Sequence, residues 1–280
     1  MSAVIDVHTH VFPPEIIQKR EDLCKKDIGF SILYGKKNIP IADIHSITQY
    51  MESQGIDYAA VLSFPFKDRG LLSMCNDYVL SVAQGKNLLP FIMIDVWDES
   101  WSMKEIDRCF SKGAKGVGEV SFYGGRLGKN EFQRLNRFTD ALREKGGILL
   151  IHVNEQLGHS YNGKINVDFN SLYKFIEENR GLKIVLAHLG GGVCFYEFMP
   201  EVKKAFENVF YDTAAVPYLF SAEVYTFVQN HLSQKVLFGS DFPLLSYSRY
   251  TRGLSTVKEE ARELILYKNA QKLFNLNWER

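Results

Sequence analysis

Residues 147–153 (GILLIHV) and 182–188 (LKIVLAH) decide the fold of this chain. Each is a short run of aliphatic residues that contains or ends in histidine, and the amphipathic segment Leu172–Asn179 lies between them. Apolar strands that alternate with helices are typical of a parallel sheet that is buried on both faces. Gly146 and Gly181 stand where glycines that end helices are expected.

The same unit recurs along all 280 residues, which gives eight candidate strands and a mean of 35 residues per unit (280/8). A single-domain (β/α)8 TIM barrel over residues 1–280 fits this count, since such barrels have about 250 residues. An open doubly wound sheet has the same periodicity and remains the alternative. The other six strands are expected at Ala3–His8, Tyr58–Phe64, Leu88–Val96, Lys115–Phe122, Val209–Ala214 and Lys235–Ser240. Further helices are expected at Asp43–Ser53, Leu71–Ala83, Glu131–Lys145, Val202–Glu207 and Ser221–Leu232.

The longest interruption of this pattern is segment 11–42, between the first strand and the first expected helix. In a barrel this segment is the first loop on the carboxyl-terminal face, where binding sites are built. A lid over the site and a simple surface excursion are both consistent with it.

Composition excludes several classes of function. Lys+Arg and Asp+Glu each total 33, so the chain lacks the strong basic charge with which proteins bind nucleic acids or anionic membranes. No stretch approaches the ~20 apolar residues that cross a bilayer, and the start MSAVIDVHTH does not resemble a signal peptide. The four scattered cysteines indicate free thiols in a reducing compartment. We expect a cytoplasmic enzyme that acts on a small molecule, with a homo-oligomer as an open alternative.

Polar residues at the strand ends carry the functional signal. His8 and His10 share one face of the first strand, ~6.7 Å apart along the backbone, because alternate residues of a strand point to the same side. Glu119, His152 and His188 are 33 and 36 residues apart, and Asp241 follows the last strand. Each therefore occupies the carboxyl end of a strand, and those ends form one mouth in a barrel. The spacing predicts that imidazole and carboxylate ligands converge on a metal there. Asp6, one step deeper, either orients a ligand or makes an unrelated interior contact.

Four motifs resemble, in order, those of the metal-dependent amidohydrolase superfamily, specifically its amidohydrolase-related branch, which includes small hydrolases, lactonases and non-oxidative decarboxylases. They are DVHTH at 6–10, IH at 151–152, AHLG at 187–190 and FGSDFP at 238–243. The run ILYKNAQKLFNL at 265–276 is similar to the closing helix of that branch. The resemblance implies a (β/α)8 barrel whose metal is held by His8, His10, His152, His188 and Asp241 in various combinations.

Glu119 on the fourth strand is similar to the glutamate of TatD-type hydrolases, which implies a bridge between two metal ions. The alternative is that Glu119 only hydrogen-bonds a ligand or the substrate. A shell of imidazole and carboxylate suits Zn²⁺ best, with Mn²⁺ as the alternative.

The main mechanistic hypothesis is hydrolysis of an amide, ester or lactone by a metal-activated water, with Asp241 as the general base. The alternatives are non-oxidative decarboxylation of a small carboxylated substrate, TatD-like phosphodiester hydrolysis, and a binding protein that retains the barrel without its chemistry. Substrate contacts are expected from the loops at the mouth: Arg126, Asn154, His159 and Arg249. The aromatic residues Phe12, Phe64, Trp97 and Tyr123 are candidates for its walls.

Overall fold

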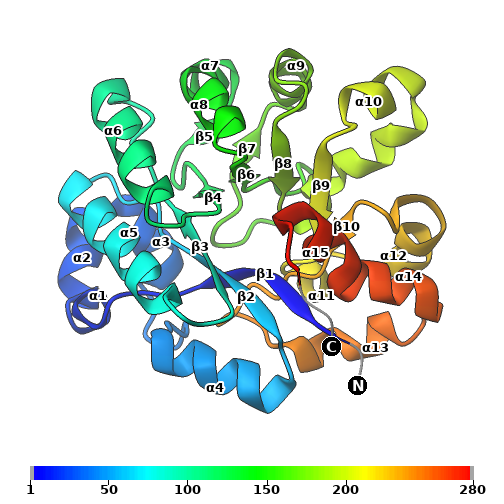
Figure 1. The fold of residues 1–280 in the computed structure, drawn as a ribbon, viewed down its shortest axis with the longest axis horizontal. Helices are drawn as coiled ribbons and strands as arrows, with labels where there is room; N and C mark the ends of the chain where they lie inside the picture. The colour runs from blue at the N-terminus through cyan, green and yellow to red at the C-terminus, as the bar shows by residue number, and fades with distance from the viewer. Residues whose placement is uncertain (1–2, 278–280) are drawn as a thin grey trace.

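Eight parallel strands form a barrel in the computed structural model, which describes residues 3–277 (Figure 1). Each expected strand is present, and the order around the sheet follows the chain. The strands are β1 (Ile5–His10), β2 (Tyr58–Leu62), β3 (Leu88–Ile92), β4 (Gly116–Val120), β6 (Ile148–Ile151), β8 (Lys183–Leu186), β9 (Val209–Asp212) and β10 (Val236–Leu237). Two short strands, β5 (Arg126–Leu127) and β7 (Asn166–Val167), pair outside the barrel.

Backbone hydrogen bonds between the first strand and the last segment close the sheet. The N–H of Val7 donates to the carbonyl of Phe238 at 2.9 Å, and the N–H of His10 donates to the carbonyl of Phe242 at 2.7 Å. The N–H of Asp241 donates to the carbonyl of His8 at 2.9 Å. The predicted barrel is therefore confirmed, and the open sheet is excluded.

Helices surround the strands on the outside (Figure 1). Outside segment 11–42, four of them begin at an aspartate whose carboxylate accepts a hydrogen bond from a backbone N–H of the first turn, which explains where they start: Asp43, Asp68, Asp98 and Asp168. These four helices are α4 (Ile44–Gln54), α5 (Arg69–Ala83), α6 (Glu99–Phe110) and α9 (Phe169–Glu178). The others outside segment 11–42 are α7 (Lys129–Leu135), α8 (Thr139–Glu144), α10 (Pro200–Ala205), α11 (Val216–Leu219), α12 (Val224–Phe227), α13 (Thr251–Leu254), α14 (Glu259–Glu263) and α15 (Asn269–Phe274).

Segment 11–42 folds into three short helices, α1 (Pro14–Gln18), α2 (Arg20–Lys26) and α3 (Ile28–Tyr34). Aromatic rings hold it on the barrel: Phe30 lies 5.5 Å from Phe64 and 5.2 Å from Phe66, measured between ring centroids, and Tyr34 lies 5.9 Å from Phe64. The segment thus builds a packed wall beside the carboxyl ends of β1 and β2. Its opening as a lid stays a prediction.

Two apolar clusters fill the molecule. One lies inside the barrel and includes Ile5, Leu62, Phe91 and Leu150 from the strands and Leu273 from α15. The larger one lies between the strands and the surrounding helices. Because the interior is filled, the carboxyl-end mouth is where a site can form. Among the described residues, no helix is long and apolar enough to span a membrane.

Phe238 supports the closure of the barrel, and replacing it should be costly. Its side chain is fully buried between the rings of Tyr247 and Tyr250, at 5.2 and 5.3 Å. Phe238→Ala should lower the free energy of unfolding by about 3–5 kcal/mol, because it leaves a cavity. Urea denaturation measures this change. Leu157→Ala, at a side chain that is 84% exposed, is the control and should change stability by less than about 0.5 kcal/mol. A loss at position 238 as small as the control's would contradict this account of barrel closure.

Candidate metal centre

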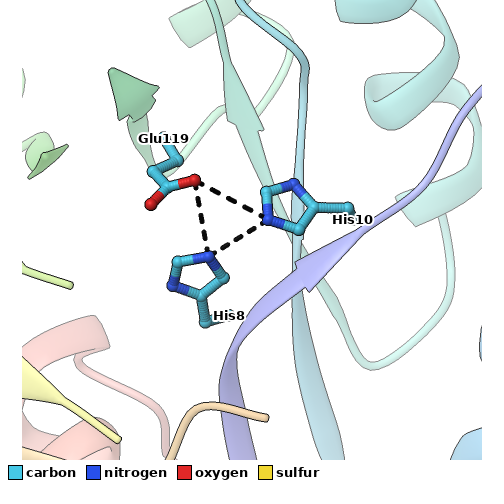
Figure 2. Close-up of side chains that lie close together, drawn as sticks. All are labelled: His8, His10 and Glu119. Atoms are coloured by element: carbon cyan, nitrogen blue, oxygen red, sulfur yellow. Dashed lines mark hydrogen bonds and ion pairs between the residues drawn. The ribbon is translucent and has the colours of Figure 1, made fainter. Parts of the chain in front are cut away.

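The barrel brings the six predicted ligands together at its mouth. His8 and His10 come from β1 and Glu119 from β4. His152 directly follows β6, His188 lies two residues beyond β8 (188 − 186), and Asp241 lies four residues beyond β10 (241 − 237). Figure 2 shows the side chains of His8, His10 and Glu119 pointing toward one another. Residues up to 233 positions apart in the sequence (241 − 8) thus share one site.

Four donor atoms form a first group. The Nε2 atoms of His8 and His10 are 3.1 Å apart, and Glu119 Oε2 is 3.7 Å from each of them. Asp241 Oδ1 lies 3.3 Å from His10 Nε2 and 3.7 Å from His8 Nε2. Ligand atoms that each lie ~2.1 Å from a tetrahedral ion are about 3.4 Å from one another. The spacing of this group therefore suits a single metal ion.

The second oxygen of Glu119 faces another group. Glu119 Oε1 is 2.8 Å from His152 Nδ1 and 3.4 Å from His188 Nε2, and these two nitrogens are 3.2 Å apart. Each group contains three residues whose donor atoms could hold an ion. Glu119 belongs to both, so its carboxylate has the position of a bridge.

In three histidines, one ring nitrogen points away from the cluster of donor atoms, and its hydrogen-bond partner shows which of the two ring nitrogens carries the hydrogen. His8 Nδ1 lies 2.8 Å from Asp212 Oδ2, His188 Nδ1 lies 2.8 Å from the carbonyl of Ala214, and His152 Nε2 lies 3.1 Å from that of Gly163. Each partner is an acceptor, so each of these nitrogens carries the hydrogen.

In neutral imidazoles, the opposite nitrogens then present lone pairs to one another and to Glu119. Such lone pairs repel unless a cation or extra protons lie between them. The donor set therefore fits a divalent metal ion.

Electrostatics keeps the carboxylates ionised. Burial alone would favour neutral acids, but the charges of His152 and His8 and hydrogen bonds from His152 and His188 hold the pKa of Glu119 well below its usual range. Burial also opposes ionisation of Asp241, whose side chain is partly buried, yet the hydrogen bond from His10 and the nearby histidine charges lower its pKa to about 2. Both are thus anionic at neutral pH, which is the form that binds metals.

The backbone is left-handed at two of the predicted ligands. His188 has φ 59° and Asp241 has φ 64°, a region that side-chain-bearing residues rarely adopt. Such residues concentrate at functional sites. Gly191 follows in the same turn with φ 59°, and a Cβ there would lie 2.2 Å from the backbone of Asn154. Because Gly191 has no side chain, the turn after His188 can pack closely against the loop that follows His152.

Asp212 was not among the predicted residues, although the structure gives it a central position. Its Oδ2 accepts from His8 Nδ1, and its Oδ1 accepts from the backbone N–H of His188 at 2.9 Å and of Ala214 at 3.0 Å. One buried carboxylate thus fixes two candidate ligands. The signal in the sequence was the same as for the others, because Asp212 ends its strand.

Asp6 holds backbone N–H groups that belong to, or lie next to, the predicted metal ligands His8 and Asp241. It accepts hydrogen bonds from the N–H of His8 at 3.1 Å, from the N–H of Ser240 at 2.9 Å and from the hydroxyl of Tyr50 at 2.8 Å. Burial raises its pKa to about 6. These contacts fix the backbone of His8 and Ser240 and do not reach an imidazole ring, so both alternatives for Asp6 stay predictions.

A cavity of about 720 Å³ opens above the donor atoms. Among the described residues that line it, Lys36 is the single lysine or arginine. Four tyrosines and several aliphatic residues form most of the wall. The lining includes Tyr34, Tyr123, Tyr161, Tyr218, Leu33, Ile39, Pro40, Leu219, Pro243, Leu244, Asn38, His159, Ser160 and Asn162.

The residues predicted to contact substrate lie in different places. His159 lines the cavity. The side chain of Asn154 is engaged with the loop instead, since its amide bonds both the N–H and the carbonyl of Ile165. Arg126 lines a neighbouring hollow, and Arg249 is not among the residues that line the metal cavity.

The four aromatic residues that were candidates for the walls of the substrate site also lie in different places. Tyr123 lines the cavity, whereas Phe12 and Phe64 are buried in the aromatic cluster beneath segment 11–42. Trp97 is half exposed and lines the neighbouring hollow. Loop conformations that the strand pattern does not determine cause this separation.

The family model described as amidohydrolase matches residues 5–276 of this sequence. The chain belongs to the amidohydrolase family. A comparison with curated proteins gives no significant match. The similarity of Glu119 to the glutamate of TatD-type hydrolases is not addressed by these findings and stays a prediction.

Solved structures share the fold of this amidohydrolase-family chain at low sequence identity. A 5-carboxyvanillate decarboxylase from Novosphingobium aromaticivorans, in complex with manganese and 4-hydroxy-3-methoxy-5-nitrobenzoic acid, has TM-score 0.76 at 17% identity, covering 98% of this chain and 96% of its own. A dihydroxybenzoic acid decarboxylase from Polaromonas, with manganese and 2-nitroresorcinol, has TM-score 0.67 at 15% identity, with 100% and 98% covered. A probable 2-pyrone-4,6-dicarboxylic acid hydrolase from Acinetobacter baumannii has TM-score 0.66 at 14% identity, with 98% and 99% covered.

Replacing Asp212 tests its role in fixing the ligands. Asp212→Asn should weaken Mn²⁺ binding by ~10–100-fold, because the amide is uncharged and its single acceptor oxygen replaces the two that serve His8 Nδ1 and the backbone N–H of His188. Competition with a chromogenic chelator measures the affinity. Asp140→Asn, on the exposed surface, is the matched control and should bind as the wild type does. Equal affinities in the two variants would rule out this role for Asp212.

Metal binding should also depend on pH. Burial opposes the charged form of His188, but the hydrogen bond and charge of Glu119 raise its pKa to about 9 in the metal-free protein. Below that pH a proton occupies the lone pair that would bind metal, so binding must release it. The affinity for Mn²⁺ should therefore rise with pH up to about 9, by up to tenfold per pH unit for each proton released. Titrations at several pH values measure the slope, and a flat or falling affinity would contradict the assignment of protons.

Proposed function

We propose that this protein is a metal-dependent, non-oxidative decarboxylase of small aromatic carboxylic acids. The observation that carries the proposal is the position of the donor cluster at the floor of a cavity walled by Tyr34, Tyr123, Tyr161 and Tyr218. Aromatic walls suit a flat ring, and the floor suits its carboxylate. Solved structures of the same fold include decarboxylases of 5-carboxyvanillate and of dihydroxybenzoates, which supports this chemistry.

The residues that would hold the metal are His8, His10, Glu119 and Asp241, with His152 and His188 as the second group. A divalent ion bound there supplies a Lewis acid that attracts the substrate's oxygen atoms and fixes the ring. The mixed donor set accommodates Zn²⁺ or Mn²⁺. Manganese in two of the solved structures makes Mn²⁺ at least as good a candidate as Zn²⁺.

Asp241 is the group we assign to proton transfer. Its carboxylate lines the cavity beside His10, and it is ionised at neutral pH. It must therefore first accept a proton, from solvent or from a substrate hydroxyl, and then deliver it to the ring carbon that carries the carboxylate. When the bond between that carbon and the carboxylate breaks, its electron pair stays in the ring and CO₂ leaves. Overall, the carboxylate and one proton give the arene and CO₂.

Hydrolysis of a small lactone or ester is the second candidate function. The observation that favours it is Glu119, whose two oxygens face two donor groups, an arrangement that suits two ions and a bridging nucleophile. The structural similarity to a probable pyrone-dicarboxylic acid hydrolase agrees with it. Phosphodiester cleavage has less support, because Lys36 is the single lysine or arginine among the described lining residues.

One assay distinguishes these reactions. The Mn²⁺-loaded and Zn²⁺-loaded proteins are incubated with 5-carboxyvanillate, 2,6-dihydroxybenzoate and a panel of aromatic lactones, and CO₂ and products are followed by mass spectrometry. We expect CO₂ in a 1:1 ratio with the decarboxylated ring. Opening of lactones without CO₂ release, and no turnover of the acids, would replace decarboxylation by hydrolysis.

Asp241→Asn tests the proton-transfer role. The amide keeps the size of the side chain but cannot carry the proton, so turnover should fall by ~10²-fold or more. Circular dichroism and metal content should be measured on the same sample, so that loss of metal is not mistaken for loss of the proton carrier. Activity near that of the wild type would remove Asp241 from this role.

A further inference from the structure

A second hollow of about 610 Å³ lies beside the metal cavity, over the ends of β2, β3 and β4. Tyr123 is the one described residue that lines both. The proposed reaction uses Tyr123 only as part of the wall of the metal cavity, and it gives no role to the second hollow.

The ring of Tyr123 forms the partition between the two spaces. On the metal side, its hydroxyl donates to Glu119 Oε2 at 3.3 Å, and its ring lies 5.4 Å from the ring of His152. On the other side, a Cβ added to Gly29, which lines the second hollow, would lie 3.3 Å from Tyr123 Cβ. The ring also stacks on Phe64, with centroids 6.0 Å apart and planes at 12°. Contacts with Glu119, His152 and Phe64 thus hold the side chain of Tyr123 in place.

The second hollow has a chemistry that suits an aromatic or aliphatic extension. Phe66, Met93, Ile94 and Val96 give it apolar wall. Its carboxylates are engaged locally, since Asp27 accepts from the backbone N–H groups of Phe30 and Lys67. A substituent that reached this space would therefore meet apolar surface, with the cationic side chains of Lys67 and Arg126 also in the lining.

From these contacts the structure assigns Tyr123 as the residue that limits substrate size on the β4 side of the metal cavity. With tyrosine at this position, the cavity accepts an acid with one ring. A smaller side chain would join the two hollows and admit a substrate with a second ring. This inference shares with the proposed function only the premise that the cavity receives an aromatic acid.

Binding of inert probes tests the assignment without requiring turnover. Salicylate, 4-phenylsalicylate and 5-phenylsalicylate are titrated into the Mn²⁺-loaded protein by calorimetry. Three variants are compared with the wild type. Tyr123→Ala opens the partition, Tyr123→Phe keeps it but loses the hydroxyl, and Tyr218→Ala removes a tyrosine elsewhere in the lining. Metal content and thermal unfolding are measured for each, and Tyr123→Leu replaces the alanine variant if the latter does not fold.

We expect the affinity of at least one phenylsalicylate, relative to salicylate, to rise by about tenfold or more in Tyr123→Ala, because a ring becomes buried. The ratio should stay unchanged in Tyr123→Phe and Tyr218→Ala. An unchanged ratio in Tyr123→Ala, or an equal rise in Tyr218→Ala, would overturn the assignment while leaving the proposed function intact. Absence of salicylate binding in every protein would instead overturn the shared premise, and both proposals with it.

Discussion

The mutual repulsion of a buried carboxylate and converging imidazole lone pairs is the constraint on which the mouth of this barrel depends. Glu119 is almost fully buried, and its two oxygens lie within 3.7 Å of nitrogens from four histidines. Burying an ionised carboxylate is costly unless charges or hydrogen bonds compensate it. The three strands that supply or lead into these histidines, β1, β6 and β8, must therefore end at the right depth around β4, as they do in the closed barrel. A divalent cation held by the same donor atoms would complete the compensation.

A second set of contacts connects this centre to the walls of the cavity. Asp212 and the carbonyls of Ala214 and Gly163 fix the orientation of the histidines that surround Glu119. Gly163 belongs to the loop that lines the cavity, so the imidazole of His152 touches the metal group on one side and the substrate wall on the other. The geometry of the donors and the shape of the pocket are thus coupled. If this site binds metal and substrate as proposed, changes in this loop should affect both.

The sequence predicts the strands, and it predicts which strand-end residues meet at the mouth, because both follow a simple period. The residues of a buried parallel strand are continuously apolar, and a polar residue at each strand end occupies the same level of the barrel, as His152 and His188 do. Asp212 is also a polar residue at the end of a strand, so the same reasoning could have predicted its place at the mouth. Its second contact, with the backbone of His188, depends on the left-handed turn there, which no local pattern indicates.

The loops follow other rules. Arg126 and Asn154 stand in sequence where the mouth was expected, but their placement depends on contacts with distant segments. Asn154 is bound to Ile165, and Arg126 belongs to a short strand that pairs with β7. Segment 11–42 contains three helices whose aromatic packing involves Phe64 and Phe66, some thirty residues further on. Long-range packing of this kind cannot be derived from spacing, and this limits what the sequence says about substrates.

The most direct test of the central claim is the metal content of the wild type and of Glu119→Gln after both are incubated with Mn²⁺ and desalted. Elemental analysis gives the ratio of metal to protein, and circular dichroism verifies that both chains are folded. Because the amide has nearly the same shape but no charge, the account predicts at least one ion per wild-type chain and less than about one tenth of that in the variant. A wild type without metal, or a variant that retains as much as the wild type, would contradict it.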